Sequence, residues 1–343
     1  MQSDQQFFMG VDVSKEWVDV ALLRVVNHQK QPVTCSRFDN TGAGMLALEQ
    51  WLGSHQVSFD QRSLLVAENT GVYHRRLWQW CSERGLPLVI GNAARIKWSL
   101  GITRGKSDGV DARRLCAYAY KEREELKPTP LHNAELTALK DLFSARSRLK
   151  QQAASIRVYL SELRHTSSRE VQAVLQQAHQ AALQGIEASL KAVEVQIKAA
   201  LAANESLLTN YRLLTSVPGV GHLTAVYLLC CTNNFVLKPS GKQLACYAGV
   251  APFSHTSGKS IKGRDRVHPM ANKELKRLLH LGALSAVKNC AEFKDYYRRK
   301  TGEGKHPLSV LNAIRNKLAL RAAAVIMKQK PYTTNPPITT PCA

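Results

Sequence analysis

The segment from Asn133 to Tyr211 constrains the fold more than any other, because it contains almost no Gly or Pro and is rich in Ala, Leu, Gln, Lys and Arg. Such residues favour helices, so the segment is predicted to be nearly all helix. Apolar residues recur every three or four positions in two runs, separated by a weak break near residues 165–168. Two long helices in a hairpin or coiled coil are expected, which would pair subunits or separate the two ends of the chain. The alternative is a helical bundle packed on the N-terminal domain.

Short apolar runs before this segment predict a layered α/β domain. Residues 7–26 contain two runs rich in Val and Phe that are split by polar residues, which is typical of an antiparallel strand pair. A third strand is expected near residues 36–39, buried strands at 63–69 and 86–92, and a helix from about residue 73 to 84. Strands that alternate with helices of this length favour an α/β domain that ends near residue 125.

The C-terminal part begins with a helix end, a Pro-Gly-Val-Gly turn at Pro218 to Gly221 and a new apolar helix, which is a helix-hairpin-helix pattern. Such a turn would direct N–H groups outward, where a helix N-terminus can hold a phosphate, so Gly219 and Gly221 are predicted to contact nucleic acid. A purely structural turn fits the same residues. The rest of this part is predicted to be mostly α-helical, and the Pro-rich tail after Lys330 to be unstructured.

The charge of the chain indicates a polyanionic partner. It has 47 Lys and Arg against 26 Asp and Glu, a net charge of +21, and residues 255–330 contain 18 basic and 5 acidic residues. Charge alone does not distinguish DNA from RNA or from an anionic membrane surface. No run approaches the roughly 18 apolar residues that cross a bilayer, and no signal-peptide pattern is present. The eight cysteines are scattered without a C-x-x-C pair, which favours reduced thiols in a cytoplasmic protein.

Four acidic residues of the N-terminal domain are candidates for one site. Asp12 lies within an otherwise apolar strand, where an unpaired charge is costly, and Glu68 ends a buried-strand pattern. Asp108 and Asp111 share a face if their segment is helical. Carboxylates are ligands that Mg²⁺ prefers, and two such ions can assist phosphodiester chemistry. Taken singly, each acid is explained equally simply as an exposed or salt-bridged carboxylate, whereas the joint pattern favours a metal site. Three acids in more polar contexts are interpreted as surface charges: Asp19, Asp39 and Glu83.

These blocks resemble a known family over nearly the whole chain. They are GVDVSK, VAENTGVY and KSDGVDARRL in the N-terminal part, then SVPGVGHLTAVYLL, KQLACYAGVAPFSHTSGKS and ANKELKRLLHLGALSA. In this order they are similar to the insertion-sequence one-hundred-and-ten family of transposases, relatives of the pilin-gene invertases. The resemblance implies a RuvC-like (RNase H-like) domain with a DEDD acid set, a coiled-coil dimerisation segment and a transposase domain with a catalytic serine. It also implies a bridge RNA that pairs with donor and target DNA.

The resemblance places the nucleophile at Ser257, in the Ser-Gly step after the Ala-Gly-x-x-Pro run. A serine hydroxyl needs a base, a metal or strong charge stabilisation, and the resemblance implies that Ser257 of one subunit meets the carboxylate site of another. From the residues alone, Ser254 and Ser260 are equally good candidates, and His255 is either a base or an exposed loop histidine. Basic residues that are predicted to contact phosphates, or else are solvated surface charges, are Lys259, Lys262, Arg264, Arg266, Lys273, Lys276, Arg277, Arg298, Arg299 and Lys300, with Tyr296 and Tyr297 beside them for base stacking.

The chain is thus predicted to contain a RuvC-like catalytic domain at residues 1–127, a coiled-coil segment at 128–211, a transposase domain at 212–330 and a disordered tail at 331–343. The leading hypothesis is an RNA-guided DNA recombinase, a dimer or tetramer, that forms a serine–DNA bond and holds Mg²⁺ through its four acids. A RuvC-like nuclease that uses water as the nucleophile is the second hypothesis. The third is a non-catalytic nucleic-acid scaffold.

Overall fold

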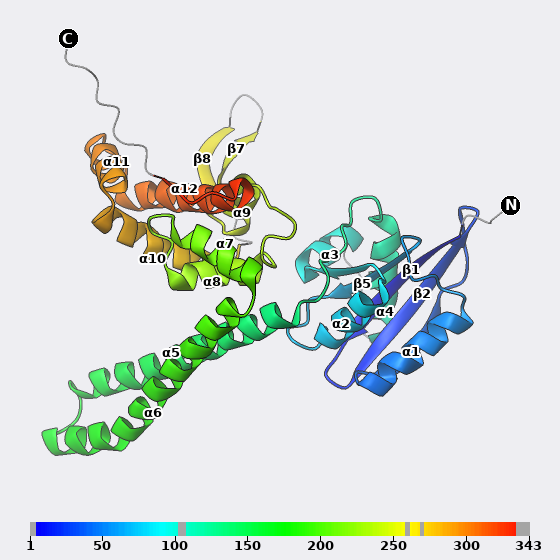
Figure 1. Ribbon diagram of the computed structural model, residues 1–343, viewed down its shortest axis with the longest axis horizontal. Coiled ribbons are helices and arrows are strands. Elements are labelled where there is room, and N and C mark those ends of the chain that lie inside the picture. Colours follow the sequence, from blue (N-terminus) through cyan, green and yellow to red (C-terminus); the bar gives the residue numbers. More distant parts are fainter. Residues whose placement is uncertain (1–4, 102–107, 258–260, 268–270, 334–343) are drawn as a thin grey trace, which may run out of the picture. The chain divides into compact units, whose positions relative to one another are not determined.

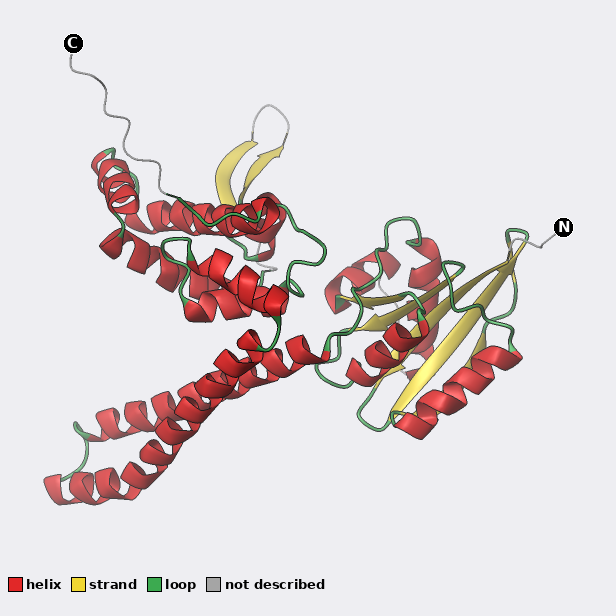
Figure 2. Ribbon diagram, viewed as in Figure 1, coloured by secondary structure: helices red, strands yellow, loops and turns green. Residues whose placement is uncertain are grey.

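The structure is a computed structural model that describes residues 5–101, 108–257, 261–267 and 271–333, with only the backbone described at residues 108–109, 254–257 and 261–266. The chain divides into two compact units, Met1–His132 and Asn133–Ala343 (Figure 1). The first unit combines a sheet with helices, and the second is nearly all helix (Figure 2). The predicted α/β class with mostly helical content is confirmed.

The first unit is built on one mixed sheet with the strand order β3-β2-β1-β5-β6, in which β4 also pairs with β2. β2 runs antiparallel to β1, which confirms the predicted strand pair, whereas β5 runs parallel to β1 and β6 parallel to β5. The strands are β1 (Gln5–Val13), β2 (Trp17–Val26), β3 (Gln29–Lys30), β4 (Thr34–Asp39), β5 (Ser63–Glu68) and β6 (Leu88–Gly91).

Helices cover both faces of this sheet, because alternate residues of the central strands are apolar on each side. One face carries Met9 and Val11 of β1 and packs on α1 (Gly42–Ser54) and α2 (Arg75–Arg84). The other carries Phe8 and packs on α3 (Ala93–Leu100) and α4 (Asp108–Lys121). Both helices on the second face follow the last predicted strand; α3 was not predicted, and α4 confirms that the segment with Asp108 and Asp111 is helical.

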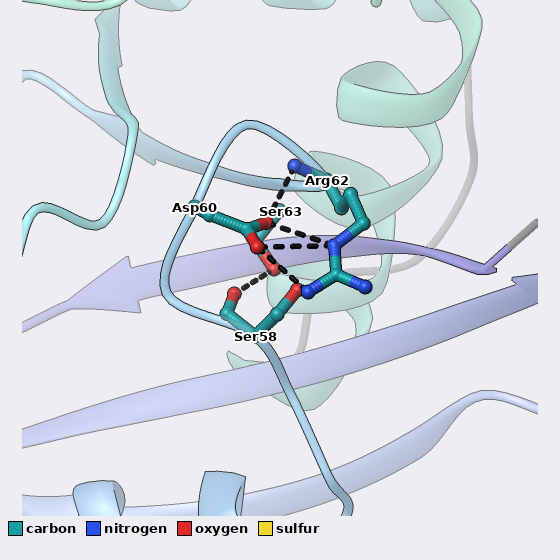
Figure 3. A network of polar contacts seen from close by, with 4 residues as sticks. All are labelled: Ser58, Asp60, Arg62 and Ser63. Carbon is teal, nitrogen blue, oxygen red and sulfur yellow. Dashed lines mark hydrogen bonds and ion pairs between the residues drawn. The ribbon is translucent and has the colours of Figure 1, made fainter. Parts of the chain in front are cut away.

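A local polar network fixes the turn that leads into β5 (Figure 3). The Asp60 carboxylate accepts hydrogen bonds from the backbone N–H of Arg62 at 2.9 Å and from its guanidinium at 2.7 Å. Ser63 Oγ donates to the backbone carbonyl of Ser58. The hydrogen bonds from Arg62 lower the pKa of Asp60 to about 2, so the contact persists over the ordinary pH range. It sets the first residue of the strand that ends at Glu68.

The second unit begins with the two long helices that the sequence predicts, α5 (Ala134–Leu163) and α6 (Arg169–Ala202). They lie side by side and antiparallel (Figure 1), with Arg146 paired to Glu194 at 3.0 Å and Arg157 paired to Glu187 at 2.9 Å. Apolar residues at the end near Ala134 and Ala202 join the core of the unit. Further along, several apolar side chains are exposed: Val158, Tyr159, Val171, Val174 and Val195.

The remaining elements of this unit form one core with the ends of α5 and α6. The helices are α7 (Glu205–Thr215), α8 (His222–Cys231), α9 (Gly241–Tyr247), α10 (Lys273–Asn289), α11 (Ala291–Gly302) and α12 (Pro307–Lys328), and a hairpin of β7 (Pro252–Ser257) and β8 (Ile261–Val267) lies between α9 and α10. The sequence placed this hairpin in a loop, because its strands are polar and lack an apolar alternation.

The start of the expected unstructured tail is held on the unit. The backbone N–H of Tyr332 donates to Ser216 Oγ at 2.8 Å, and its hydroxyl donates to Glu292 at 3.1 Å. The expectation of disorder therefore fails for Pro331 to Thr333, and residues 334–343 lie outside the described part. Of the helices in the described ranges, none combines the length and apolar character required to cross a membrane.

Candidate active site

Asp12 and Glu68 are neighbours on the two central strands of the first unit. β1 and β5 run parallel and in register up to Val11 opposite Ala67, so Asp12 and Glu68 occupy the next position on each strand. Neighbouring strands lie about 4.8 Å apart, and residues in register share a face. This is the face covered by α3 and α4, and both side chains are half-buried on it. The structure thus brings the two strand-borne acids together.

Helix α4 crosses this face directly over β1. A Cβ added to Gly10 would lie 2.2 Å from the carbonyl oxygen of Ala112 and 2.1 Å from the amide nitrogen of Cys116, so only a residue without a side chain fits. The Sγ of Cys116 donates to the carbonyl of Phe8 at 3.2 Å. Residues later in α4 therefore contact earlier residues of β1, and the first turn of α4 faces the end of β1 that carries Asp12.

The spacing of the two elements places Asp108 level with Asp12. Four helical residues from Ala112 back to Asp108 rise by about 6 Å, and two strand residues from Gly10 to Asp12 span about 6.6 Å. Positions 108 and 111 also continue the buried stripe of α4 by one turn. The stripe consists of Ala112, Leu115, Cys116 and Ala119.

Asp111 has a partner on its own helix. Its half-buried carboxylate accepts a hydrogen bond from the Arg114 guanidinium at 2.9 Å. The side chain of Asp108, the other acid of this turn, lies outside the described residues. The backbone of α4 thus carries both aspartates at the level of the strand acids, while Arg114 neutralises one of them.

Asp19 belongs to the same row of polar residues, so its interpretation as a surface charge is wrong. It lies directly opposite Asp12 on β2, is 9% exposed, and accepts two hydrogen bonds from Arg37 of β4 at 2.9 and 3.0 Å. Like charges in directly opposed positions destabilise a sheet, and Arg37 removes this repulsion by neutralising Asp19. The alternation of Asp19 with the buried Val18 and Val20 was the available signal.

The acids supply the carboxylate oxygens that a divalent cation prefers, and their backbone positions lie at a similar level along the sheet. Mg²⁺ prefers carboxylate oxygens and is usually held by one or two of them together with water and substrate oxygens. Among the described side chains, no three His, Cys, Asp or Glu residues gather closely enough to hold an ion. Asp12 and Glu68 are the two neighbouring acids whose side chains are described. Asp111 would bind the cation in place of Arg114.

Ser257 is the last residue of β7, where it pairs with Ile261 of β8. The side chains of Ser257, Ser254 and His255 lie outside the described residues, as does all of Ser260. In β8, Lys262 lies opposite Thr256 and Arg266 opposite Phe253, and the register is irregular between Phe253 and His255. The side chains of these two basic residues and the whole of Lys259 are also outside the described part. Ser257 and three of the predicted basic residues, Lys262, Arg264 and Arg266, thus belong to the backbone of one two-stranded ribbon.

Half of the basic residues predicted on α10 and α11 are engaged with acids. Arg277 pairs with Glu274 at 2.6 Å, while Lys300 and Arg299 pair with Glu303 at 2.6 and 3.7 Å. The structure describes no ion pair of the other three: Lys273, Lys276 and Arg298. Tyr296 and Tyr297, considered for base stacking, are instead partly buried against the core of the unit.

The Pro218 to Gly221 turn joins α7 to α8 as the sequence predicts. Gly219 has a φ of +93°, and an added Cβ would lie 2.8 Å from the carbonyl oxygen of Gly282 on α10, so its positive φ and the close approach of the turn to α10 account for this glycine. Gly221 precedes α8, and a cavity of about 460 Å³ opens beside it, lined by the turn and by α10. His222 accepts or donates a hydrogen bond at 3.0 Å with the Tyr211 hydroxyl, and burial lowers its pKa.

Two family models match the chain. A DEDD transposase model of the IS110 family matches residues 9–179, which include all four predicted acids. The model described as "Transposase IS116/IS110/IS902 family" matches residues 211–298, which include the hairpin with Ser257.

Curated relatives agree with these matches. The pilin gene-inverting protein of Moraxella lacunata is 28% identical over 341 residues, which cover 95% of this chain and 97% of the relative, and the Moraxella bovis protein of the same name is 27% identical over 339 residues. A 43.6 kDa protein of insertion element IS110 from Streptomyces coelicolor is 35% identical over 136 residues, 38% of this chain and 33% of that protein. The resemblance that the sequence motifs indicated is confirmed: this chain belongs to the IS110 family of transposases.

Proposed function

We propose that this transposase is an RNA-guided DNA recombinase of an insertion element, which cuts and rejoins strands through a serine–DNA bond. Its metal ligands are Asp12, Glu68, Asp108 and Asp111. Membership of the family indicates DNA as the substrate, with cleavage and rejoining as the activity, and a DEDD domain implies a divalent metal, typically Mg²⁺. The observation that carries the proposal is the close, antiparallel packing of α4 on β1 at Gly10, because Asp108 and Asp111 belong to the first turn of that helix and Asp12 follows Gly10 by two residues on that strand.

The chain itself provides rigid positions for the ligands. Asp12 and Glu68 stand at neighbouring positions of two paired strands, and side chains on regular elements are placed more reproducibly than those on loops. A cation held there would stabilise negative charge on the oxygens of the reacting phosphodiester. The strand order of the sheet, with one antiparallel strand beside three parallel ones, supports the RNase H-like fold that the family resemblance implies.

Ser257 is proposed as the nucleophile. Its Oγ forms a bond to phosphorus while the bond from phosphorus to a sugar oxygen breaks; the serine loses its proton, and the departing oxygen gains one. Because the phosphodiester is exchanged rather than hydrolysed, the strand can be rejoined later without an energy source. The names of the Moraxella relatives describe gene inversion, which requires rejoining, and so support a recombinase over a nuclease.

The acids and the serine belong to different compact units of the chain, residues 1–132 and 133–343. We propose, as the family resemblance implies, that the site is shared between subunits, so that the serine of one copy meets the acids of another. The long α5–α6 pair is proposed as a coiled coil that joins two copies, because apolar residues such as Val158, Val174 and Val195 are exposed along it. The bridge RNA that the resemblance implies would be a second polyanionic partner, besides DNA, for a chain with a net charge of +21.

The nucleophile is tested by trapping the protein–DNA adduct on labelled element-end DNA in Mg²⁺. Ser257→Ala should abolish the adduct, whereas the matched control Ser254→Ala should retain it. If Ser257→Ala still cuts the DNA, water is the nucleophile and the nuclease hypothesis replaces this one.

The shared site is tested by mixing two inactive variants. Ser257→Ala and Asp12→Asn copies should restore adduct formation together, since each supplies what the other lacks. A mixture that stays inactive, although each variant assembles like the wild type, would place the acids and serine in one copy. Sequencing of RNA that copurifies with the protein from its native cell tests the guide: absence of a transcript from the element ends would contradict the RNA-guided proposal.

A further inference from the structure

Arg315 of α12 has a side-chain donor for which the described residues offer no acceptor. Its side chain is half-buried, and its Nε is buried without a hydrogen-bond partner among them. Among the described residues, none forms an ion pair with it. Arg321 on the same helix does have a partner for its charge, because it binds Glu292 and lies over the rings of Phe293 and Tyr332 at 4.5 and 4.7 Å, although its Nη1 is also buried without an acceptor among the described residues. A buried donor without an acceptor is costly, so the Nε of Arg315 is available to an acceptor on a bound ligand.

A second unsatisfied donor faces the same region from α10. His280 is half-buried, its Nδ1 is buried without a partner, and α10 packs against α12. Burial lowers the pKa of His280, and the positive charge of Arg315 contributes to the same shift. A neutral imidazole still donates one N–H. Two helices that pack against each other thus each carry a buried donor without an acceptor among the described residues.

These helices lie near the foot of the β7–β8 hairpin. Asn312, one turn before Arg315, donates to the carbonyl of Val250 at 3.0 Å, two residues before β7 begins. On the other side, the backbone N–H of Asn272 donates to the carbonyl of Tyr247 at 2.9 Å, directly before α10 begins. Both stems of the hairpin are therefore anchored close to these helices.

Lys276 extends the positive charge along the face of α10 that carries His280. Lys276 lies four residues before His280 and so shares its face of the helix, and the structure describes no ion pair for it. Arg277, its neighbour, is instead neutralised by Glu274. A strand of nucleic acid that follows this face would pass from the amine of Lys276 to the half-buried guanidinium of Arg315.

We propose that Arg315 and His280, flanked by Lys276, bind a backbone phosphate of a nucleic-acid strand at the foot of the β7–β8 hairpin. The guanidinium would donate two parallel hydrogen bonds to the phosphate oxygens and the imidazole one. Such a contact positions a strand relative to the hairpin that carries Ser257 without reading its bases. The inference rests on the proposed nucleic-acid substrates and extends them to Arg315 and His280, neither of which is among the site residues predicted from the sequence.

The test is the salt dependence of binding by the full chain, measured on duplex DNA and on single-stranded RNA of equal length. Arg315→Gln should weaken binding about tenfold or more, since it removes a charge-assisted hydrogen bond. When the logarithm of the affinity is plotted against the logarithm of the salt concentration, the negative slope should become less steep by about 0.9 on the duplex or by about 0.7 on the single strand. The nucleic acid on which the slope falls identifies the strand held at this site.

Three further variants make the result specific. Arg157→Gln removes the same charge from an exposed ion pair with Glu187 and should change the slope much less. Arg315→Lys should keep most of the slope but lose affinity, because an ammonium does not form the two-pronged contact. In the free protein, Arg315→Gln should leave the unfolding midpoint unchanged or raise it, whereas Arg321→Gln should lower it.

The outcomes separate this inference from the proposed function. If the wild type binds DNA and RNA and Arg315→Gln keeps both slopes, the phosphate site is refuted while the recombinase proposal stands. If Arg315→Gln lowers the unfolding midpoint as Arg321→Gln does, Arg315 has a structural role and the inference is equally refuted. A wild type that binds neither nucleic acid would overturn both proposals.

Discussion

Gly10→Ala tests whether the contact between β1 and α4 aligns the acids. The added Cβ would lie 2.1 Å from the amide nitrogen of Cys116 and 2.2 Å from the carbonyl oxygen of Ala112, and ordinary contact begins at 3.4 Å. Both atoms are backbone, so no side chain can turn aside and α4 must retreat from the strand by about 1.3 Å. Overpacking of this kind costs about 1–3 kcal/mol of unfolding free energy.

The same displacement moves the first turn of α4 relative to Asp12. A misplacement of about 1 Å in a catalytic group can reduce the rate about a hundredfold, so Gly10→Ala should lose DNA cleavage well beyond its loss of stability. The assays are urea unfolding and the initial rate of strand cleavage in Mg²⁺ at a temperature where the variant is fully folded. Gly53→Ala in α1 is the matched control, because its Cβ meets nothing within 4 Å. Equal stability and cleavage rates in the two variants would refute the proposed alignment.

Three further perturbations follow from the structure. Gly219→Ala should cost about 2 kcal/mol of unfolding free energy because of its positive φ and the close carbonyl oxygen. Gly185→Ala in α6 should instead gain about 1 kcal/mol, because the added Cβ has no neighbour within 4 Å. Urea unfolding measures both changes. Arg37→Met should cost about 3 kcal/mol in the same assay by leaving Asp19 buried without its partner, and replacing Asp19 by Leu as well should recover most of the loss. Burial lowers the pKa of His222, so His222 takes up a proton at a higher pH in the unfolded chain than in the folded one, and stability should decline below about pH 6.5. Urea unfolding midpoints at about pH 7.5 and 5.5 measure this decline, which should be smaller in His222→Asn.

Elements with a strong apolar period could be predicted from the sequence. The pattern around Met9 and Val11 identified β1 because both faces of that strand are buried. The long helices α5 and α6 followed from composition, since Gly and Pro are nearly absent there. The hairpin of β7 and β8 was missed because PFSHTS and IKGRDRV carry few apolar residues, and pairing between the two strands rather than burial defines them.

The candidate site was predictable in its residues but not in its geometry. Asp12 was recognisable as an acid within an apolar run and Glu68 as an acid at the end of one, but their adjacency depends on the parallel pairing of two strands far apart in sequence. Asp19 was misinterpreted because its partner Arg37 lies 18 residues away on another strand. Arg315 gave no signal, since only the packing of α10 on α12 shows that its charge lacks an acceptor.

The contact at Gly10 also limits how this chain can change in length. Each α-helical residue turns the helix by about 100°, so a single insertion between Asp108 and Ala112 would swing one or both aspartates off the sheet-facing side while the rest of α4 stayed in place. A deletion there would do the same in the opposite sense. Insertions upstream of Asp108 would leave that phase intact. Descendants of this transposase should therefore vary in length before Asp108 and keep a fixed count of residues from Asp108 to Cys116.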